Sequence, residues 1–375
     1  MATRTDCIDS TREFKALKGC WEELLSQREG PTAFLSFEWL FGWWSIWGND
    51  PELRIFVVRD GSKIIGIAPL CIRFGKRAGL SFRKIGFLGE GVGSDYLDFL
   101  SEPGREEEVA RSVASALARE KGWDMILLSA FDPDSRHLAV LRREMGSGVK
   151  QGERCPYLAL PESWDHYLAG LSSNRRYTLR RKINHLHQRY RVEFVKVEGP
   201  LQGTEPVEDW MRLHRLRWAG RSSALKDPLS EQFHREVAPE MFRGGWGRLF
   251  FLRVNGQTAA ALYGFLCGKR FLYYQAGLDP RFESQSAGLV LMALTIQEGI
   301  KAGWREFDFL RGEESYKNHW SKAVRETVTL CRYRSTMGGL LLRCIDGVRG
   351  KLVAALRNGL GPGAFLRIRM ILGKE

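Results

Sequence analysis

The chain contains Arg248-Leu-Phe-Phe-Leu-Arg-Val-Asn255-Gly256-Gln-Thr-Ala-Ala-Ala-Leu-Tyr-Gly-Phe265, two apolar strand sequences around an Asn-Gly pair. Much earlier it contains Leu53-Arg-Ile-Phe-Val-Val-Arg-Asp60-Gly61-Ser-Lys-Ile-Ile-Gly-Ile-Ala-Pro-Leu70, the same pattern with Asp-Gly. Both dipeptides supply the positive φ angles that a tight hairpin turn requires. The sequence therefore predicts a β-hairpin of the same kind in each half of the chain.

The segments that follow the two hairpins also match. Each hairpin is followed by a further strand, a helix, a Gly-Trp pair and another strand. The predicted helix covers residues 106–121 and ends at Gly122 in the first half, and covers 287–302 and ends at Gly303 in the second. A glycine just past a helix end commonly adopts the left-handed conformation that closes the helix. Because the same order occurs twice, we predict a duplication of one α/β unit.

A duplicated unit of this kind predicts two tandem domains of the α/β (α+β) class, each a mixed sheet flanked by helices. A length of 375 residues also exceeds what one hydrophobic core usually supports. We place the first domain at residues 1–150, the second at 151–335 and a basic amphipathic tail at 336–375. Further helices are expected before the hairpins, at residues 36–47, 164–190 and 207–218.

The composition is that of an ordinary globular protein, with 44% apolar and 27% charged residues. Seven cysteines are scattered without a Cys-x-x-Cys pair or a Cys/His ligand spacing, so we expect free buried thiols in a reducing compartment and no metal. Residues 1–18 carry charges throughout, and no apolar run approaches the roughly 20 residues of a membrane span. We expect a soluble, cytoplasmic protein.

The net charge of +13 is concentrated in two segments. Residues 171–191 contain no acidic side chain, and their cations are Arg175, Arg176, Arg180, Arg181, Lys182, Arg189 and Arg191. A second basic excess follows Gly338. Such segments suit phosphate groups on a cofactor, a nucleic acid or an anionic membrane, and a solvated helix face is the alternative.

The helix start of the second copy differs from that of the first. A helix N-terminus offers free N–H groups and a positive dipole end, which suit a phosphate. In the first copy this turn reads Gly104-Arg-Glu-Glu-Glu108, whose carboxylates would repel an anion. In the second it reads Ser284-Gln-Ser286-Ala287-Gly288-Leu289, which is small and uncharged. A phosphate-bearing cofactor therefore suits the second copy, and an ordinary N-cap at Ser286 is the alternative.

A polar strand and loop follow in the second copy: Arg305-Glu-Phe-Asp308-Phe-Leu-Arg311-Gly-Glu-Glu-Ser-Tyr316-Lys317-Asn-His-Trp320. A charged side chain within an apolar strand must be paired or functional. Acyl transfer to an amine needs a proton acceptor and a donor that stabilises the oxyanion. Asp308 could act as the base or orient the acceptor, and Lys317 could meet the oxyanion or a phosphate. The alternative is an Asp308–Arg311 salt bridge with Lys317 on the surface.

Two further segments each have two interpretations. The aromatic run within residues 36–47 is either a ligand-stacking platform or core packing, and its helical spacing favours packing. The tail has an amphipathic stretch at 340–360 and an apolar, basic segment at 365–372. It is either a docked helix, which we favour, or a membrane-surface element.

The strand and loop from Phe307 to Trp320 resemble the signature of the CelD/BcsL-like branch of the GNAT N-acyltransferase superfamily. That branch is itself similar to the FemABX peptidyltransferases, which carry two GNAT-type domains in tandem. Further matching segments are Phe34-Leu-Ser-Phe-Glu-Trp39 with Trp43-Trp44, Ser173-Asn-Arg-Arg-Tyr-Thr-Leu-Arg-Arg-Lys182, and Tyr273-Tyr-Gln275-Ala-Gly277-Leu-Asp279-Pro280 leading to Ser286-Ala-Gly288. The similarity extends from about Phe34 to Tyr333, and one departure is a phosphate loop with a single glycine.

The resemblance implies two tandem GNAT-like domains that move an acyl group from acyl-CoA to an amine or hydroxyl of a sugar or cell-envelope precursor. The chemistry would lie in the second domain, and the first would be non-catalytic or bind the acceptor. Cofactor contacts are implied at Tyr273, Tyr274, Gln275, Ser286, Ala287 and Gly288. The catalytic candidates are Asp308, Arg311, Tyr316 and Lys317, and the candidates for binding substrate or phosphate are Arg175, Arg176, Arg180 and Trp320.

Two alternatives stay open at this point. An aminoacyl-tRNA donor, as in FemABX relatives, would use the basic segment 175–182 to hold RNA phosphates. A non-catalytic accessory protein of envelope polysaccharide synthesis would keep the fold without the reaction. We expect acyl-CoA and a small-molecule or glycan acceptor as partners, and no DNA. The expected location is the cytoplasm, with contact at the inner face of the membrane as a variant of it.

Overall fold

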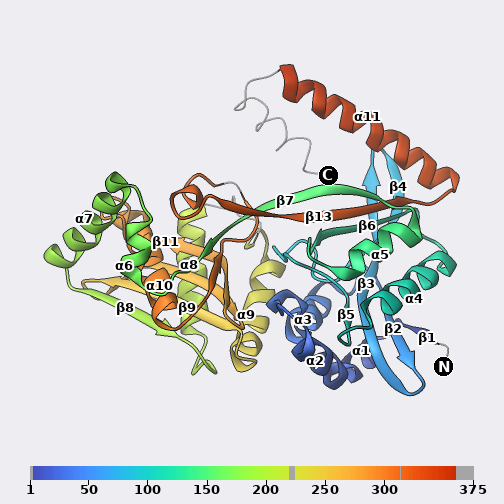
Figure 1. Ribbon diagram of the computed structural model, residues 1–375, viewed down its shortest axis with the longest axis horizontal. Helices are drawn as coiled ribbons and strands as arrows, with labels where there is room; N and C mark the ends of the chain where they lie inside the picture. Colours follow the sequence, from blue (N-terminus) through green and yellow to red (C-terminus); the bar gives the residue numbers. More distant parts are fainter. Residues whose placement is uncertain (1–2, 219–223, 313, 360–375) are drawn as a thin grey trace.

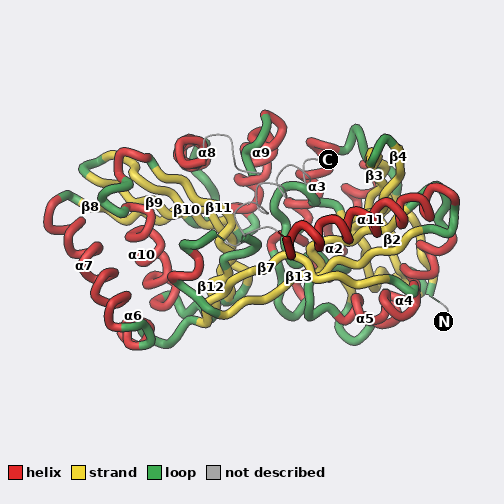
Figure 2. The backbone as a smooth tube through the Cα atoms, turned by 90° about the horizontal axis from the view of Figure 1, so that it is seen from above, coloured by secondary structure: helices red, strands yellow, loops and turns green. Residues whose placement is uncertain are grey.

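A computed structural model describes residues 3–218, 224–312 and 314–359 of the chain. Across these residues, thirteen strands form one sheet in the order β1-β2-β3-β4-β6-β13-β7-β12-β11-β10-β9-β8, with β5 paired to β3. The sheet runs through the length of the molecule with helices on both of its faces (Figures 1 and 2). The predicted α/β class is confirmed, and the sheets of the two halves join edge to edge.

The two halves have the same topology. In the first, β2 (Glu52–Asp60), β3 (Lys63–Arg77) and β4 (Leu80–Phe87) are antiparallel, and α4 (Glu106–Arg119) crosses to β6 (Met125–Phe131), which is parallel to β4. In the second, the same roles belong to β9 (Gly247–Val254), β10 (Gln257–Cys267), β11 (Arg270–Leu278), α10 (Ala287–Lys301) and β12 (Glu306–Asp308). The predicted duplication is therefore visible in the strand order.

Local backbone conformations explain where these elements end. Gly122 and Gly303 have φ of +76° and +77°, the left-handed values predicted after the two helices. Asn255 and Gly256 both have positive φ and form the turn of the second hairpin. The first hairpin differs, because Asp60 still pairs with Lys63 and the positive φ of its turn is supplied by Gly61 alone.

Each half gives its last strand to the sheet of the other half. β7 (Gly148–Ala159) follows β6 in the chain but pairs with β12, and β13 (Ala323–Tyr333) follows β12 but pairs with β6. The two exchanged strands also pair with each other antiparallel and cross the middle of Figure 1 as two long arrows. A β-ladder, rather than a linker, therefore joins the two halves.

Two large hydrophobic cores hold the described helices other than α11. One core crosses the junction, and its helices are α1 (Thr11–Ala16), α2 (Lys18–Gln27), α3 (Phe37–Trp47), α4, α5 (Arg136–Met145), α8 (Glu205–Trp218) and α9 (Pro228–Arg243). The other lies within the second half and holds α6 (Trp164–Ala169), α7 (Ser173–Arg189) and α10. Short elements and edges complete the fold: β1 (Arg4–Ile8), β5 (Leu100–Ser101), β8 (Val192–Val197), and 3-10 turns at Ala33–Leu35, Pro280–Phe282 and Lys317–His319.

The helix predictions need two corrections. The helix expected at residues 164–190 is two helices, α6 and α7, and Ser172 caps the start of α7. Helix α9 was not predicted, and it contains Pro239, a residue that ordinarily argues against a helix interior. Packing of its apolar face against α3 outweighs this cost, since Phe233 contacts Trp39 with ring centroids 4.9 Å apart.

The aromatic run at residues 36–47 and the start of the C-terminal tail both pack against the body of the protein. Trp39 is completely buried, so core packing is the correct interpretation for that side chain of the aromatic run. The tail forms α11 (Met337–Gly359), whose Leu342 is buried against Phe82, Met125 and Cys331. This contact supports the docked-helix interpretation, while the segment 365–372 lies outside the described residues.

All seven cysteines are free, as predicted. Four of them are buried, but Cys7 and Cys344 are exposed, which corrects the expectation that all are buried. No helix in the part of the chain that the structure describes is long and apolar enough to cross a membrane.

Candidate active site

Strands β11 and β12 diverge soon after they meet. They pair only between Arg270–Leu272 and Glu306–Asp308. Strand β11 then continues to Leu278, and among the described residues no strand pairs with this edge of Tyr273–Leu278. In the first half, by contrast, β4 ends at Phe87, shortly after its last pair with β6 at Ile85. The second half therefore has an open wedge beside β11.

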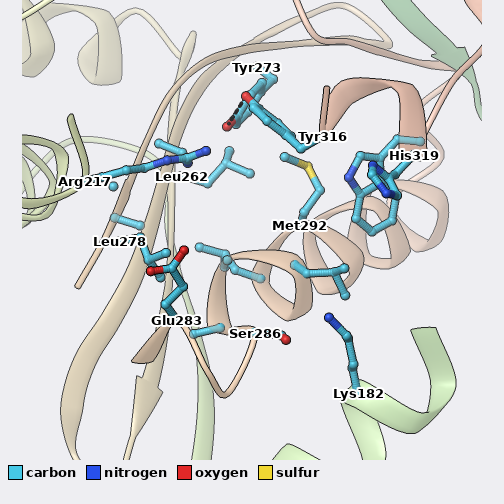
Figure 3. A pocket seen from close by; sticks show the side chains of 18 residues that line it. Lys182, Arg217, Leu262, Tyr273, Leu278, Glu283, Ser286, Met292, Tyr316 and His319 are labelled. Atoms are coloured by element: carbon cyan, nitrogen blue, oxygen red, sulfur yellow. Dashed lines mark hydrogen bonds between the residues drawn. The ribbon is translucent and has the colours of Figure 1, made fainter. Parts of the chain in front are cut away.

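A cavity of about 260 Å³ occupies this wedge (Figure 3). One wall is β11, through Tyr273, Ala276, Gly277 and Leu278. The other walls are the first turns of α10, from Ser286 to Met292, and the loop after β12, with Tyr316, His319 and Trp320. Arg217 of α8 and Lys182 of α7 also face the cavity, as Figure 3 shows.

The start of α10 is open toward the cavity. Ser286 has φ of +59°, a left-handed conformation that is uncommon for a non-glycine residue, and its side chain makes no capping hydrogen bond. The N–H groups of Ala287, Gly288 and Leu289 donate to no other protein group among the described residues. Ser286 therefore occupies the N-cap position without the side-chain hydrogen bond of the ordinary N-cap given as the alternative. Free N–H groups at the positive end of a helix form an anion site.

Two tyrosines and an arginine lie together in the cavity. The Tyr316 hydroxyl donates to the Tyr273 hydroxyl at 3.2 Å, and the Arg217 guanidinium is 5.3 Å from the Tyr316 ring centroid. Burial raises the pKa of both phenols, that of Tyr316 well above its usual value. Both hydroxyls therefore keep their protons at neutral pH. Together with Arg217 they can stabilise a negative charge that develops in the cavity.

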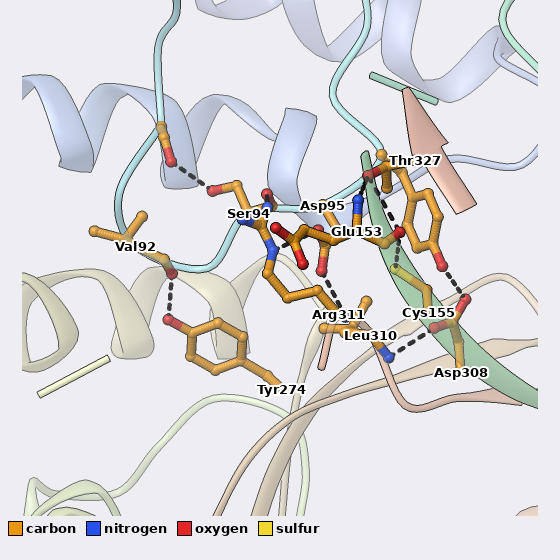
Figure 4. A network of polar contacts seen from close by, with 12 residues as sticks. Val92, Ser94, Asp95, Glu153, Cys155, Tyr274, Asp308, Leu310, Arg311 and Thr327 are labelled. Carbon is orange, nitrogen blue, oxygen red and sulfur yellow. Dashed lines mark hydrogen bonds and ion pairs between the residues drawn. The ribbon is translucent and has the colours of Figure 1, made fainter. Parts of the chain in front are cut away.

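Asp308 and Arg311 lie outside this cavity, in a polar network at the junction of the halves (Figure 4). The buried carboxylate of Asp308 accepts from the Tyr96 hydroxyl at 2.7 Å and from the Leu310 N–H at 2.8 Å. Arg311 Nε donates to Asp95 at 2.7 Å. The Asp308–Arg311 pair of the alternative interpretation does not form, because Asp308 instead pairs with Arg325 at 3.0 Å. Burial raises the pKa of Asp308 to about 6.

Lys317 is buried rather than on the surface, contrary to the alternative interpretation. Its Nζ donates to the carbonyl of Arg311 at 2.7 Å and lies 2.9 Å from a carboxylate oxygen of Glu314. It is not among the residues that line the cavity. In this conformation Lys317 stabilises the loop that carries Tyr316.

The remaining predicted site residues lie outside the cavity. Tyr274 points to the opposite side of β11, where its hydroxyl donates to the Val92 carbonyl at 2.6 Å. The Gln275 side chain contacts His214 at 3.1 Å. Arg175, Arg176 and Arg180 lie on α7, and the last two line a groove on its outer surface. The predicted residues that share the cavity are Tyr273, Ser286, Ala287, Gly288, Tyr316 and Trp320.

The chain is similar to a known family in sequence and to known proteins in structure. Residues 173–318 match a family described as acetyltransferase (GNAT) domain. The crystal structure of FemX matches with a TM-score of 0.57 and 9% identity, over 89% of this chain and 98% of that one. The structure of L-PGS from Bacillus licheniformis matches with a TM-score of 0.54 and 12% identity, over 87% and 94%. These matches show a GNAT-like fold.

A third solved structure has a similar fold. The C-terminal domain of a putative lysylphosphatidylglycerol synthetase from Agrobacterium fabrum has a TM-score of 0.52 at 11% identity, over 89% of this chain and 95% of that one. No curated protein matches the chain in sequence. The GNAT match at 173–318 covers β9 to β12 and α10, and so includes most of the residues around the wedge.

Sequence reasoning missed several residues of the GNAT-like cavity. Arg217 and Glu283 line it, and so does His319. Arg217 belongs to the run Arg215-Leu-Arg217-Trp218, where nothing in the pattern distinguishes the arginine that faces the cavity from its exposed neighbour. The packing of α8 against β11 makes this distinction, and it is a tertiary contact.

Proposed function

We propose that the protein transfers an acyl group from acyl-CoA to an amine or hydroxyl of a sugar or other cell-envelope precursor, at the cavity beside β11. The observation that carries this proposal is the open start of α10 at one end of the wedge. Its free N–H groups suit the diphosphate of the donor. The unpaired edge of Tyr273–Leu278 suits the amide groups of the donor's chain.

The side chains of the cavity suit the charges of the reaction. The acceptor attacks the thioester carbonyl, the carbonyl oxygen gains negative charge, and the leaving thiolate takes a proton. Protonated Tyr316 and Tyr273, beside Arg217, can stabilise that oxygen or protonate the thiolate. His319 and Glu283 are the titratable groups of the same cavity that can accept the acceptor's proton. Asp308, Arg311 and Lys317 act as positioning residues, because they hold the loop that carries Tyr316.

The first half would bind the acceptor in this scheme. It has a cavity of about 420 Å³ lined by Trp43, Trp47, Arg73 and Glu90. The partly exposed ring of Trp47 suits a sugar ring, and Arg73 and Glu90 supply polar groups. The division into domains at 1–150 and 151–335, the CelD/BcsL-like branch and a location at the inner face of the membrane belong to the same proposal.

Calorimetric titration with acetyl-CoA and longer acyl-CoAs tests the donor site. We expect Gly288→Glu to weaken binding at least tenfold, because a carboxylate at the helix start repels the diphosphate. Gly288→Ala is the matched control, since a Cβ at this position meets only the Leu278 methyl groups at 3.9 Å. Failure of the wild type to bind any acyl-CoA, or equal binding by the glutamate variant, would contradict the proposal.

One observation favours the alternative donor, an aminoacyl-tRNA. The cations of α7 take part in no ion pair among the described residues, and Arg175, Arg180 and Arg181 are exposed. A basic helix face of this kind suits RNA phosphates. Titration with tRNA at two salt concentrations separates the two donors: salt-sensitive binding favours the RNA, and absence of binding removes it.

A further inference from the structure

A second group of residues with catalytic geometry lies in the first half. Ser101 ends β5, His137 lies in the first turn of α5, and Asp98 precedes β5. Ser101 Oγ is 3.0 Å from His137 Nε2, and His137 Nδ1 is 2.9 Å from Asp98 Oδ1. This is the order and spacing of a serine nucleophile, its base and the carboxylate that orients the base.

Asp98 determines where the protons of this group lie. Burial opposes its ionisation, but His137 and Arg28 outweigh that effect and lower the pKa of Asp98. An ionised carboxylate only accepts hydrogen bonds, so His137 Nδ1 must carry a proton. On the neutral ring, Nε2 is then the acceptor for the Ser101 hydroxyl proton. This is the tautomer that a general base for Ser101 requires.

The surroundings of Asp98 hold its carboxylate in place. The Phe99 N–H donates to Asp98 Oδ1 at 2.7 Å, and the Ser135 hydroxyl does so at 2.8 Å. Arg28 lies between two carboxylates, 2.8 Å from Asp98 and 3.0 Å from Asp132. These contacts fix the orientation of the carboxylate oxygen that lies 2.9 Å from His137 Nδ1.

The hydroxyl of Ser101 is within reach of a small ligand. Ser101 is partly exposed and lines a cavity of about 250 Å³, whereas His137 is 1% exposed. Glu106, the first residue of α4, lines the same cavity.

We propose that Ser101, His137 and Asp98 form a second catalytic site, which hydrolyses small acyl esters. Ser101 Oγ bonds to the ester carbonyl carbon while its proton passes to His137 Nε2. The bond to the alcohol oxygen breaks, and that oxygen takes the proton from His137. Water then attacks the acyl-serine, gives one proton to His137, and releases the acid as Ser101 recovers its proton. The site is independent of the acyl transfer proposed for the second half.

The test uses the full-length protein, diisopropyl fluorophosphate and p-nitrophenyl acetate. We expect the fluorophosphate to modify the peptide that contains Ser101, as measured by mass spectrometry. We expect Ser101→Ala to lose this label and about a hundredfold of the ester hydrolysis rate. His137→Gln should slow labelling of Ser101 while leaving the hydroxyl in place.

Ser26→Ala is the matched control, because its hydroxyl lies on α2 and donates to a backbone carbonyl, that of Glu23. This variant should keep both the label and the rate. A thermal melt of Ser101→Ala equal to that of the wild type excludes unfolding as the cause of its loss. Absence of label on Ser101, or an unchanged hydrolysis rate in Ser101→Ala, would overturn the proposal.

Discussion

Asp308 has a carboxylate that is completely buried and accepts three hydrogen bonds at the junction of the halves. Burial disfavours its charged form and raises its pKa from 3.8 to about 6. The folded protein therefore binds more protons than the unfolded chain between these two pH values. It follows that the contribution of Asp308 to the free energy of unfolding decreases as the pH rises through this window.

We predict that Asp308→Asn flattens this pH dependence. The wild type should lose up to about 3 kcal/mol of unfolding free energy between about pH 4 and pH 7 from this residue, and the variant should not. Urea unfolding at a series of pH values measures the slope, which is informative even if the loss of the Arg325 pair lowers the stability of the variant throughout. Asp209→Asn, at a partly exposed carboxylate, is the control. Identical slopes for wild type and Asp308→Asn would contradict the prediction.

Among the elements, α11 is attached to the body of the protein by few described contacts. Leu342 is buried against Phe82 and Met125, and Asp346 is paired with Arg77 and accepts from the Tyr333 hydroxyl. Its neighbour Leu341 is 51% exposed. The docking of the helix therefore depends mainly on the buried Leu342 side chain and on one partly buried polar cluster.

Leu342→Ala should release α11 and increase its amide hydrogen exchange. Removing a buried leucine side chain costs about 2 to 4 kcal/mol, and here the loss is limited to the docking free energy of the helix. Hydrogen exchange followed by mass spectrometry measures protection over residues 337–348. Leu341→Ala should leave protection unchanged, since that side chain already contacts water. Equal exchange in the two variants would show that Leu342 does not dock the helix.

At the scale of the whole molecule, the exchanged strands make the two halves dependent on each other. β6 of the first half needs β13 as its partner, and β12 of the second half needs β7. Arg311 and Asp95 add an ion pair across the same junction. A cut between the halves leaves unpaired strand edges and an exposed part of the core that crosses the junction.

We therefore predict that neither residues 1–160 nor residues 161–375 unfold cooperatively when expressed alone, because a cut after β7 separates β6 from β13 and β12 from β7, and that co-expression restores one transition. Thermal unfolding followed by circular dichroism measures cooperativity, and gel filtration of the co-expressed fragments measures their association. A separate second fragment that melts cooperatively and binds acyl-CoA would contradict the dependence of the halves.

The sequence by itself determined the repeated unit. Hairpin turns and helix ends depend on a few neighbouring residues, so Asn255-Gly256, Gly122 and Gly303 predicted them correctly. The small, uncharged residues at the start of α10 do lie beside the cavity, and the anion site at Ser286–Gly288 stays a prediction.

Only the tertiary structure decided which residues meet. Strand alternation shows that Asp308 faces away from Phe307, but its partner Tyr96 comes from the other half of the chain. Alternation also does not reveal that β7 and β13 exchange sheets, because a strand's neighbour depends on the packing of the whole chain. Asp308 and Lys317 lie outside the cavity and Arg217 lines it, for the same reason. Local sequence patterns determine which face of an element a side chain is on, and long-range packing determines what that face contacts.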